Sequence, residues 1–76
     1  MKELLETIAK ALVDYPDDVY VNEVEGEKSI ILELTVSKDD MGKVIGKQGR
    51  IAKAIRTVVK AAAVKGNKRV SVEILQ

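Results

Sequence analysis

The stretch Met41–Arg50, MGKVIGKQGR, holds three glycines and three basic residues in ten positions and no acidic residue. The segments on either side have the apolar spacing of helices, yet Gly46 and Gly49 stand close together between them. A glycine inside a helix costs about 1 kcal/mol relative to alanine. We therefore expect this interruption of the helical pattern to serve a purpose.

The composition limits the classes of function that are open to the chain. A length of 76 residues suggests a single domain over residues 1–76, and a hydrophobic fraction of 46% favours a folded one. There is no cysteine and no histidine, which removes thiolate chemistry, the commonest general base and the commonest metal ligand. We expect a non-catalytic protein without metal or cofactor. No signal peptide or membrane-spanning apolar run is present, which predicts a cytoplasmic protein.

Charge is divided unevenly between the two halves of the chain. Residues 1–40 carry eleven acids and four bases, whereas residues 41–76 carry nine bases and one acid, Glu73. Such an asymmetry suggests that the second half builds a surface for a polyanion.

The apolar spacing of residues 4–13 predicts a first helix that ends before Tyr15-Pro16, because a residue before proline avoids the helical region. Residues 19–36 alternate between apolar and polar side chains, which predicts two strands. Gly26 lies between them and marks the turn of an antiparallel hairpin. Ser37 and Asp40 then have the spacing of a capping box.

A short helix is predicted over Asp39–Ile45 and a longer one from about Gly49 to about Val64, with a break at Gly66-Asn67. Residues 70–74 alternate as a last strand. The order α-β-β-α-α-β indicates an α+β fold, with a three-stranded sheet that has its helices packed on one face. If the second and third strands are parallel neighbours, their connection is expected to be right-handed.

The glycines can be explained by anion binding. We expect Gly46 to take positive φ and end the short helix, while Gly49, lacking Cβ, admits a foreign backbone. The first amides of the next helix have no internal partner and attract phosphate. On the long helix, one broad side is expected to pack on the sheet, and the other side gathers cations. The packed side comprises Ile51, Ala54, Ile55, Val58, Ala61 and Ala62, with Ala52, Val59 and Ala63 continuing it. The cationic side comprises Arg50, Lys53, Arg56 and Lys60, with Thr57.

The segment VIGKQGRIAKAIR, Val44–Arg56, resembles the core of the KH domain, an RNA-binding module with a G-x-x-G loop. The order of elements resembles the type II arrangement, and essentially the whole chain is similar to the small bacterial KH proteins of the KhpA family. The resemblance implies a role as RNA chaperone or post-transcriptional regulator. It also implies a homodimer or a complex with a larger KH-containing protein of the KhpB kind.

We therefore expect a single KH domain that binds single-stranded RNA, with single-stranded DNA as a further ligand. The GKQG loop holds the backbone, cations of the adjoining helices anchor the strand, and apolar residues near Met41, Val44 and Ile45 receive bases. The expected RNA-binding residues are Lys43, Ile45, Gly46, Lys47, Gln48, Gly49, Arg50, Lys53 and Arg56.

Two rival functions remain open from the sequence. A helix–turn–helix could place Arg50, Lys53 and Arg56 in the major groove of duplex DNA. A protein-interaction module could use the acidic first half, with residues such as Asp17, Asp18, Glu23 and Glu25 facing a basic partner.

Overall fold

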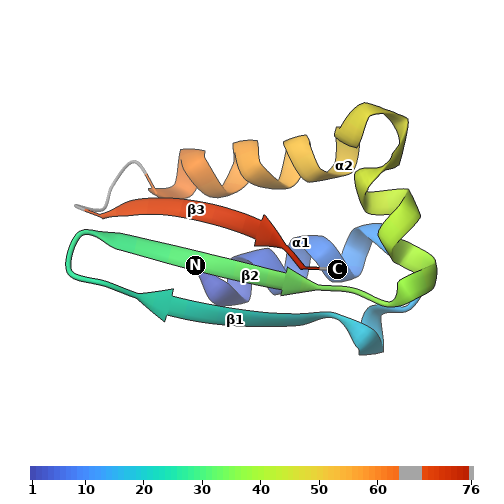
Figure 1. Cartoon of the computed structure of the whole chain (residues 1–76), viewed down its shortest axis with the longest axis horizontal. Coiled ribbons are helices and arrows are strands. Elements are labelled where there is room, and N and C mark those ends of the chain that lie inside the picture. Colours follow the sequence, from blue (N-terminus) through green and yellow to red (C-terminus); the bar gives the residue numbers. More distant parts are fainter. Residues whose placement is uncertain (64–67, 76) are drawn as a thin grey trace.

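The computed structural model describes residues 1–63 and 68–75, with the backbone alone at Lys47. Its elements follow one another along the chain as Figure 1 shows: α1 (Lys2–Leu12), the 3-10 helix η1 (Pro16–Asp18), β1 (Tyr20–Glu25), β2 (Ser29–Thr35), α2 (Lys38–Ala63) and β3 (Arg69–Ile74). The predicted helix end near Val64 and the predicted break at Gly66-Asn67 lie outside the described residues.

The three strands form one sheet in the order β1-β2-β3. β1 and β2 are antiparallel, and the N–H of Gly26 donates to the carbonyl of Ser29 at 2.7 Å in the turn between them. β2 and β3 run parallel, with Ser29 opposite Arg69 and Leu34 opposite Ile74. The predicted hairpin is confirmed, and the second and third strands are parallel neighbours.

Alternation along the strands directs the apolar side chains to one face of the sheet, where the helices lie. Val21, Leu34 and Ile74 are aligned across the three strands, and Val21 and Leu34 are fully buried. α1 passes behind the sheet in Figure 1 and adds Leu5 and Ala9 to the core. Helices on one face of a three-stranded sheet confirm the predicted α+β class.

α2 changes direction in its middle, where Figure 1 shows a tight corner between two helical segments. The corner has positive φ at two successive residues, Gln48 at 64° and Gly49 at 70°. The predicted order α-β-β-α-α-β is therefore confirmed. The expectation of positive φ at Gly46 was wrong: Gly46 lies in the helix, and Gln48, in a region that disfavours a side chain with Cβ, helps to make the turn.

The second segment of α2 buries a narrower stripe than the sequence suggested. Ala52, Ile55 and Val59 lie in the core, whereas four of the nine residues of the expected packing side are exposed. The exposed residues are Ala54, Val58, Ala61 and Ala62. We call them the apolar strip. The strip is exposed because the helix packs on the sheet along a narrow line of side chains that does not include these four residues.

Candidate nucleic-acid interface

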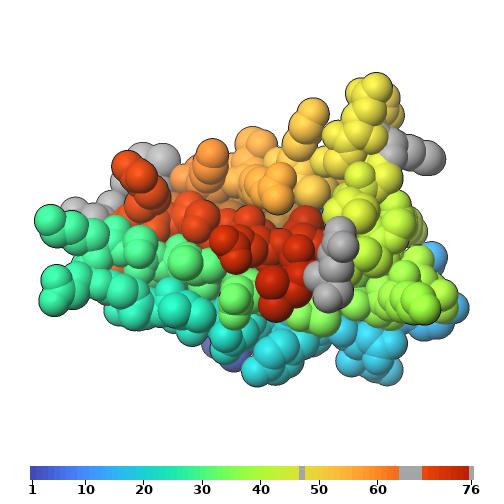
Figure 2. All heavy atoms as spheres, viewed as in Figure 1, coloured from blue at the N-terminus to red at the C-terminus, as the bar shows by residue number. Residues whose placement is uncertain are grey.

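The glycines of α2 leave bare backbone at the surface. A Cβ placed on Gly42, Gly46 or Gly49 would meet no atom within 4 Å. The fold itself therefore gives no packing reason for glycine at Gly42 or Gly46. At Gly49 the positive φ supplies one reason, since L residues with a side chain rarely adopt it. Figure 2 shows that the yellow segment around the corner projects from the body of the molecule.

An apolar groove of about 640 Å³ lies below the corner, where the first segment of α2 meets the ends of β2 and β3. It is lined by Thr35, Val36, Lys38, Met41, Gly42, Ile45 and Leu75. Ile45 is 42% exposed, an unusual state for isoleucine that leaves its side chain free to contact a ligand. Met41 and Ile45 were expected in such a groove. Val44 was expected beside them but is fully buried, because its side chain packs into the hydrophobic core.

A second hollow of about 340 Å³ adjoins the corner and is lined by Gly42, Lys43, Gly46, Arg50 and Ile51. It brings Lys43, Gly46 and Arg50 together, three of the residues expected to bind RNA. The Lys43 ammonium lies 3.3 Å from the carboxylate of Asp14, and the two side chains are 46% and 70% exposed. Two cations beside bare helix backbone suit a phosphate group.

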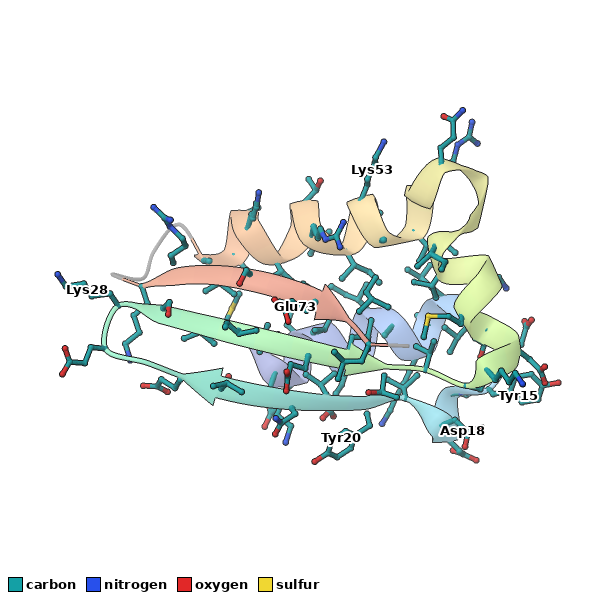
Figure 3. The ribbon with its side chains drawn as sticks, viewed as in Figure 1. Tyr15, Asp18, Tyr20, Lys28, Lys53 and Glu73 are labelled. Atoms are coloured by element: carbon teal, nitrogen blue, oxygen red, sulfur yellow. The ribbon has the colours of Figure 1, made fainter. Side chains whose placement is uncertain are left out.

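The remaining expected residues continue along the second segment of α2. Lys53 and Arg56 are exposed and line neither hollow. Figure 3 shows Lys53 pointing away from the sheet. Gln48 is exposed at the corner itself, and the side chain of Lys47 lies outside the described atoms. Lys53 and Arg56 therefore lie on the same helix as the corner, further along the chain and farther from it.

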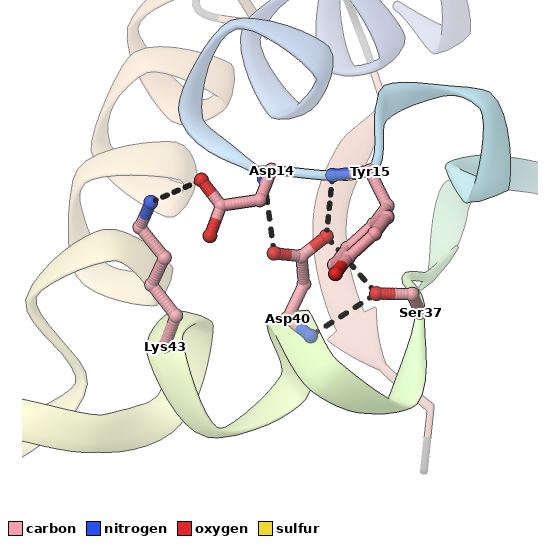
Figure 4. A network of polar contacts seen from close by, with 5 residues as sticks. All are labelled: Asp14, Tyr15, Ser37, Asp40 and Lys43. Carbon is pink, nitrogen blue, oxygen red and sulfur yellow. Dashed lines mark hydrogen bonds and ion pairs between the residues drawn. The ribbon is translucent and has the colours of Figure 1, made fainter.

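The start of α2 is fixed by a buried carboxylate, Asp40, which is only 1% exposed. Its two oxygens accept hydrogen bonds from the backbone N–H groups of Asp14 and Tyr15, each at 3.0 Å (Figure 4). The hydroxyl of Ser37 donates to the same carboxylate at 3.0 Å and accepts from the N–H of Asp40 at 3.1 Å. These bonds join the loop after α1 to the helix that lines both hollows.

Burial raises the pKa of Asp40, because a charged carboxylate loses solvation inside the protein. The hydrogen bonds from the Asp14 and Tyr15 amides and from Ser37, together with the charge of Lys43, outweigh burial. The pKa of Asp40 is therefore held below its usual value. The carboxylate stays ionised at neutral pH and remains a pure hydrogen-bond acceptor.

Sequence reasoning found only half of this arrangement. The spacing of Ser37 and Asp40 predicted a helix cap, and the Ser37 hydroxyl does cap the Asp40 amide. The bonds to Asp14 and Tyr15 span 26 and 25 residues and leave no local pattern in the sequence. The nearest available signal was an aspartate at a position where a capping box usually has Glu or Gln.

Among residues 1–63 and 68–75, no group of three or more Asp or Glu side chains is placed to hold a metal ion. Within the same ranges, no helix has both the length and the apolar character needed to cross a bilayer.

Two helical segments that meet at a G-x-x-G corner, packed on a three-stranded sheet in the order α-β-β-α-α-β, define a KH domain. The chain belongs to the family described as KhpA/KhpB, KH domain, which it matches over residues 2–74. The family resemblance of the sequence is thereby confirmed.

Three relatives illustrate how far the similarity extends. The RNA-binding protein KhpA of Clostridium perfringens is 79% identical over 75 residues, which cover 99% of this chain and 100% of the relative. The proteins of the same name from Caldanaerobacter subterraneus subsp. tengcongensis and Oceanobacillus iheyensis are 71% and 55% identical, with the same coverage. No solved structure was found to match the chain significantly.

Proposed function

We propose that this chain is a non-catalytic, cytoplasmic RNA-binding protein that holds single-stranded RNA across the GKQG corner, as a chaperone or regulator of RNA. The observation that carries the proposal is the bare backbone of Gly46 and Gly49, where an added Cβ would meet no atom, with Gly46 lining the same hollow as Lys43 and Arg50. A sugar–phosphate backbone can approach there more closely than any side chain would permit. The names of the relatives support the same ligand class.

The apolar groove completes the site. In KH domains a G-x-x-G loop clamps about four nucleotides of single strand. Met41 and Ile45 offer aliphatic surface on which unpaired bases can lie, close to the corner that would hold their phosphates. A duplex keeps its bases stacked inside and makes no use of such a groove. This favours single-stranded RNA over the duplex DNA of a helix–turn–helix protein, with single-stranded DNA as a weaker ligand that lacks the 2′-hydroxyl.

Replacing Lys47 and Gln48 together by aspartate tests the corner while leaving both glycines in place. Aspartate tolerates positive φ, so the change at Gln48 is compatible with the backbone. Two like charges at about 4 Å repel by about 4 kcal/mol at an effective dielectric constant near 20. We expect the affinity for a fluorescent single-stranded RNA to fall by a hundredfold or more, with the melting temperature nearly unchanged.

The control is the variant Lys2→Asp/Lys10→Gln on α1, which lowers the net charge by the same three units at exposed positions that line neither hollow. It should bind RNA almost as the parent chain does. The function proposed here is wrong if the double aspartate variant binds single-stranded RNA at full strength, or if the parent chain binds duplex DNA more tightly than single-stranded RNA.

We also propose that a second chain covers the apolar strip, either as a homodimer or as a complex with a larger KH protein of the KhpB kind. Val58 is 43% exposed, and it lies among small alanines that allow another helix to come close. Val58→Asp should weaken association measured by equilibrium sedimentation, alone and with the larger protein. Thr57→Asp, one residue away and also exposed, is the matched control. If both variants associate as the parent chain does, the strip is not an interface.

A further inference from the structure

Two adjoining hollows, of about 150 and 420 Å³, lie between the second segment of α2 and the first half of β3. They share Lys60, Val70 and Ser71, and so form one groove, which we call the α2–β3 groove. In Figure 2 the orange helix and the red strand that border it lie next to each other. None of its residues lines the apolar groove or the hollow at the corner.

The side chains of the α2–β3 groove carry charge of one sign. Arg56, Lys60, Lys68 and Arg69 line it, and no acidic residue does. Lys68 is held by Glu25 at 2.5 Å, but the ion pairs of the described side chains include none with Arg56, Lys60 or Arg69. Three cations without carboxylate partners around an apolar floor are suited to a polyanion.

The strand beside the groove has a free edge. Among the described strands, β3 pairs with β2 alone. The N–H of Arg69 donates to the carbonyl of Lys28, just before β2, at 3.0 Å, and the N–H of Leu75 donates to the carbonyl of Leu34 in β2 at 2.9 Å. In a parallel pair alternate residues bond to the same neighbour, so the N–H groups of Val70 and Val72 lie on the side away from β2. Both residues line the groove, which adds backbone donors to its cations.

The helix connects this groove with the GKQG corner. At about 100° per residue, Lys53, Arg56 and Lys60 fall within roughly 60° of one another on α2, on the side opposite to the apolar strip. Gly49 and Lys60 are eleven residues apart, which is about 16 Å of helix. At roughly 3.4 Å per stacked nucleotide, that distance corresponds to about five nucleotides.

We infer that the α2–β3 groove is a second phosphate-binding site, which holds the same single-stranded RNA beyond the four nucleotides at the corner. The inference rests on the proposed function. The RNA leaves the GKQG corner, follows Lys53 and Arg56 along α2, and ends with its phosphates beside Lys60 and Arg69. The footprint of one chain on RNA is then about eight to ten nucleotides.

The test compares fluorescent oligouridylates of four and ten nucleotides on the parent chain and on Lys60→Gln/Arg69→Gln. For the ten-nucleotide RNA, the loss of two phosphate contacts should reduce the steepness of the log–log plot of affinity against salt by about 1.4. At 0.1 M salt this corresponds to an affinity about 25-fold weaker. The four-nucleotide RNA should bind the variant and the parent equally. Each single variant should lose about fivefold on the longer RNA, and the difference should vanish near 1 M salt.

Lys2→Gln/Lys10→Gln removes the same net charge from α1 and should leave both affinities unchanged, and thermal melting checks that each variant is folded. If the parent binds neither RNA, the proposed function itself fails. If the parent binds both but Lys60→Gln/Arg69→Gln retains the full affinity for the longer one, the second site is refuted, and an acidic protein strand at the edge of β3 becomes the better occupant. Equal losses on both lengths also refute a separate site.

Discussion

Alanine at Gly46 and alanine at Gly49 should have opposite effects on stability, although the two glycines belong to the same motif. Gly46 is helical with ordinary φ, and a Cβ there meets no atom within 4 Å. Gly49 has equally open space but φ of +70°. The chemical change is the same at both positions, so the backbone conformation alone decides the sign.

The magnitudes follow from the two conformations. Alanine in place of a helical glycine stabilises a protein by about 0.5–1 kcal/mol. Alanine in the left-handed region costs about 1–2 kcal/mol. For a domain of this size, each kcal/mol shifts the melting temperature by about 4–8 °C. Gly46→Ala should therefore melt about 2–8 °C above the parent chain, and Gly49→Ala about 4–16 °C below it.

Gly46→Ala should weaken RNA binding even though it stabilises the fold. The new methyl group occupies the place where the sugar–phosphate backbone of the RNA is proposed to approach. It keeps the RNA too far from the protein backbone for hydrogen bonds between the two to form. Losing one or two such bonds, at about 1 kcal/mol each, weakens RNA binding by about five- to thirtyfold. Fluorescence anisotropy with single-stranded RNA measures this affinity, and thermal unfolding followed by circular dichroism measures the stability of the same samples.

The expected pattern for Gly46→Ala is a more stable protein that binds RNA less well. A variant that is more stable and binds RNA like the parent would show that Gly46 does not admit the ligand backbone. A variant that is less stable would show that a side chain at residue 46 collides with its surroundings.

Three further results are expected. The pKa of Asp40 lies below its ordinary 3.8, so the stability that its carboxylate contributes is present above that pH and is lost as the pH falls through the folded pKa. Asp40→Asn should therefore make the free energy of unfolding depend less steeply on pH in acid, which Asp39→Asn should not do. An unchanged pH dependence in Asp40→Asn would contradict this. Leu34→Ala, fully buried, should cost about 2–5 kcal/mol in urea unfolding, whereas exposed Val24→Ala should cost under about 0.5; equal costs would count against the core described here. The affinity for four nucleotides of RNA should fall with salt with a log–log slope near −2 to −3, and a flat dependence would exclude phosphate contacts as the main source of binding.

The sequence predicted the features of this fold that rest on local patterns. Alternation placed Leu32 and Leu34 on the buried face, Gly26 marked the hairpin turn, and Ser37 marked the start of α2. Each of these depends on residues within a few positions of one another, where propensity and periodicity act directly.

The features that escaped prediction depend on neighbours distant in the chain or on fine geometry. The anchoring of Asp40 to Asp14 and Tyr15 requires two loops to meet. The burial of Val44 and the exposure of Val58 depend on how α2 is rotated against the sheet, which a helical wheel does not determine. Positive φ at Gln48 is a property of the whole corner, because glutamine by itself has no preference for that region.

The parallel pairing of β2 with β3 has a consequence for how the protein acquires its structure. In the hairpin, Glu25 pairs with Ile30, only five residues away. In the parallel pair, Ser29 pairs with Arg69, which lies forty residues later in the chain. Contacts so far apart in sequence close late and slow the folding reaction. We therefore expect the hairpin of β1 and β2 to form first, and the pairing of β3 with β2 to close the sheet in the slower step.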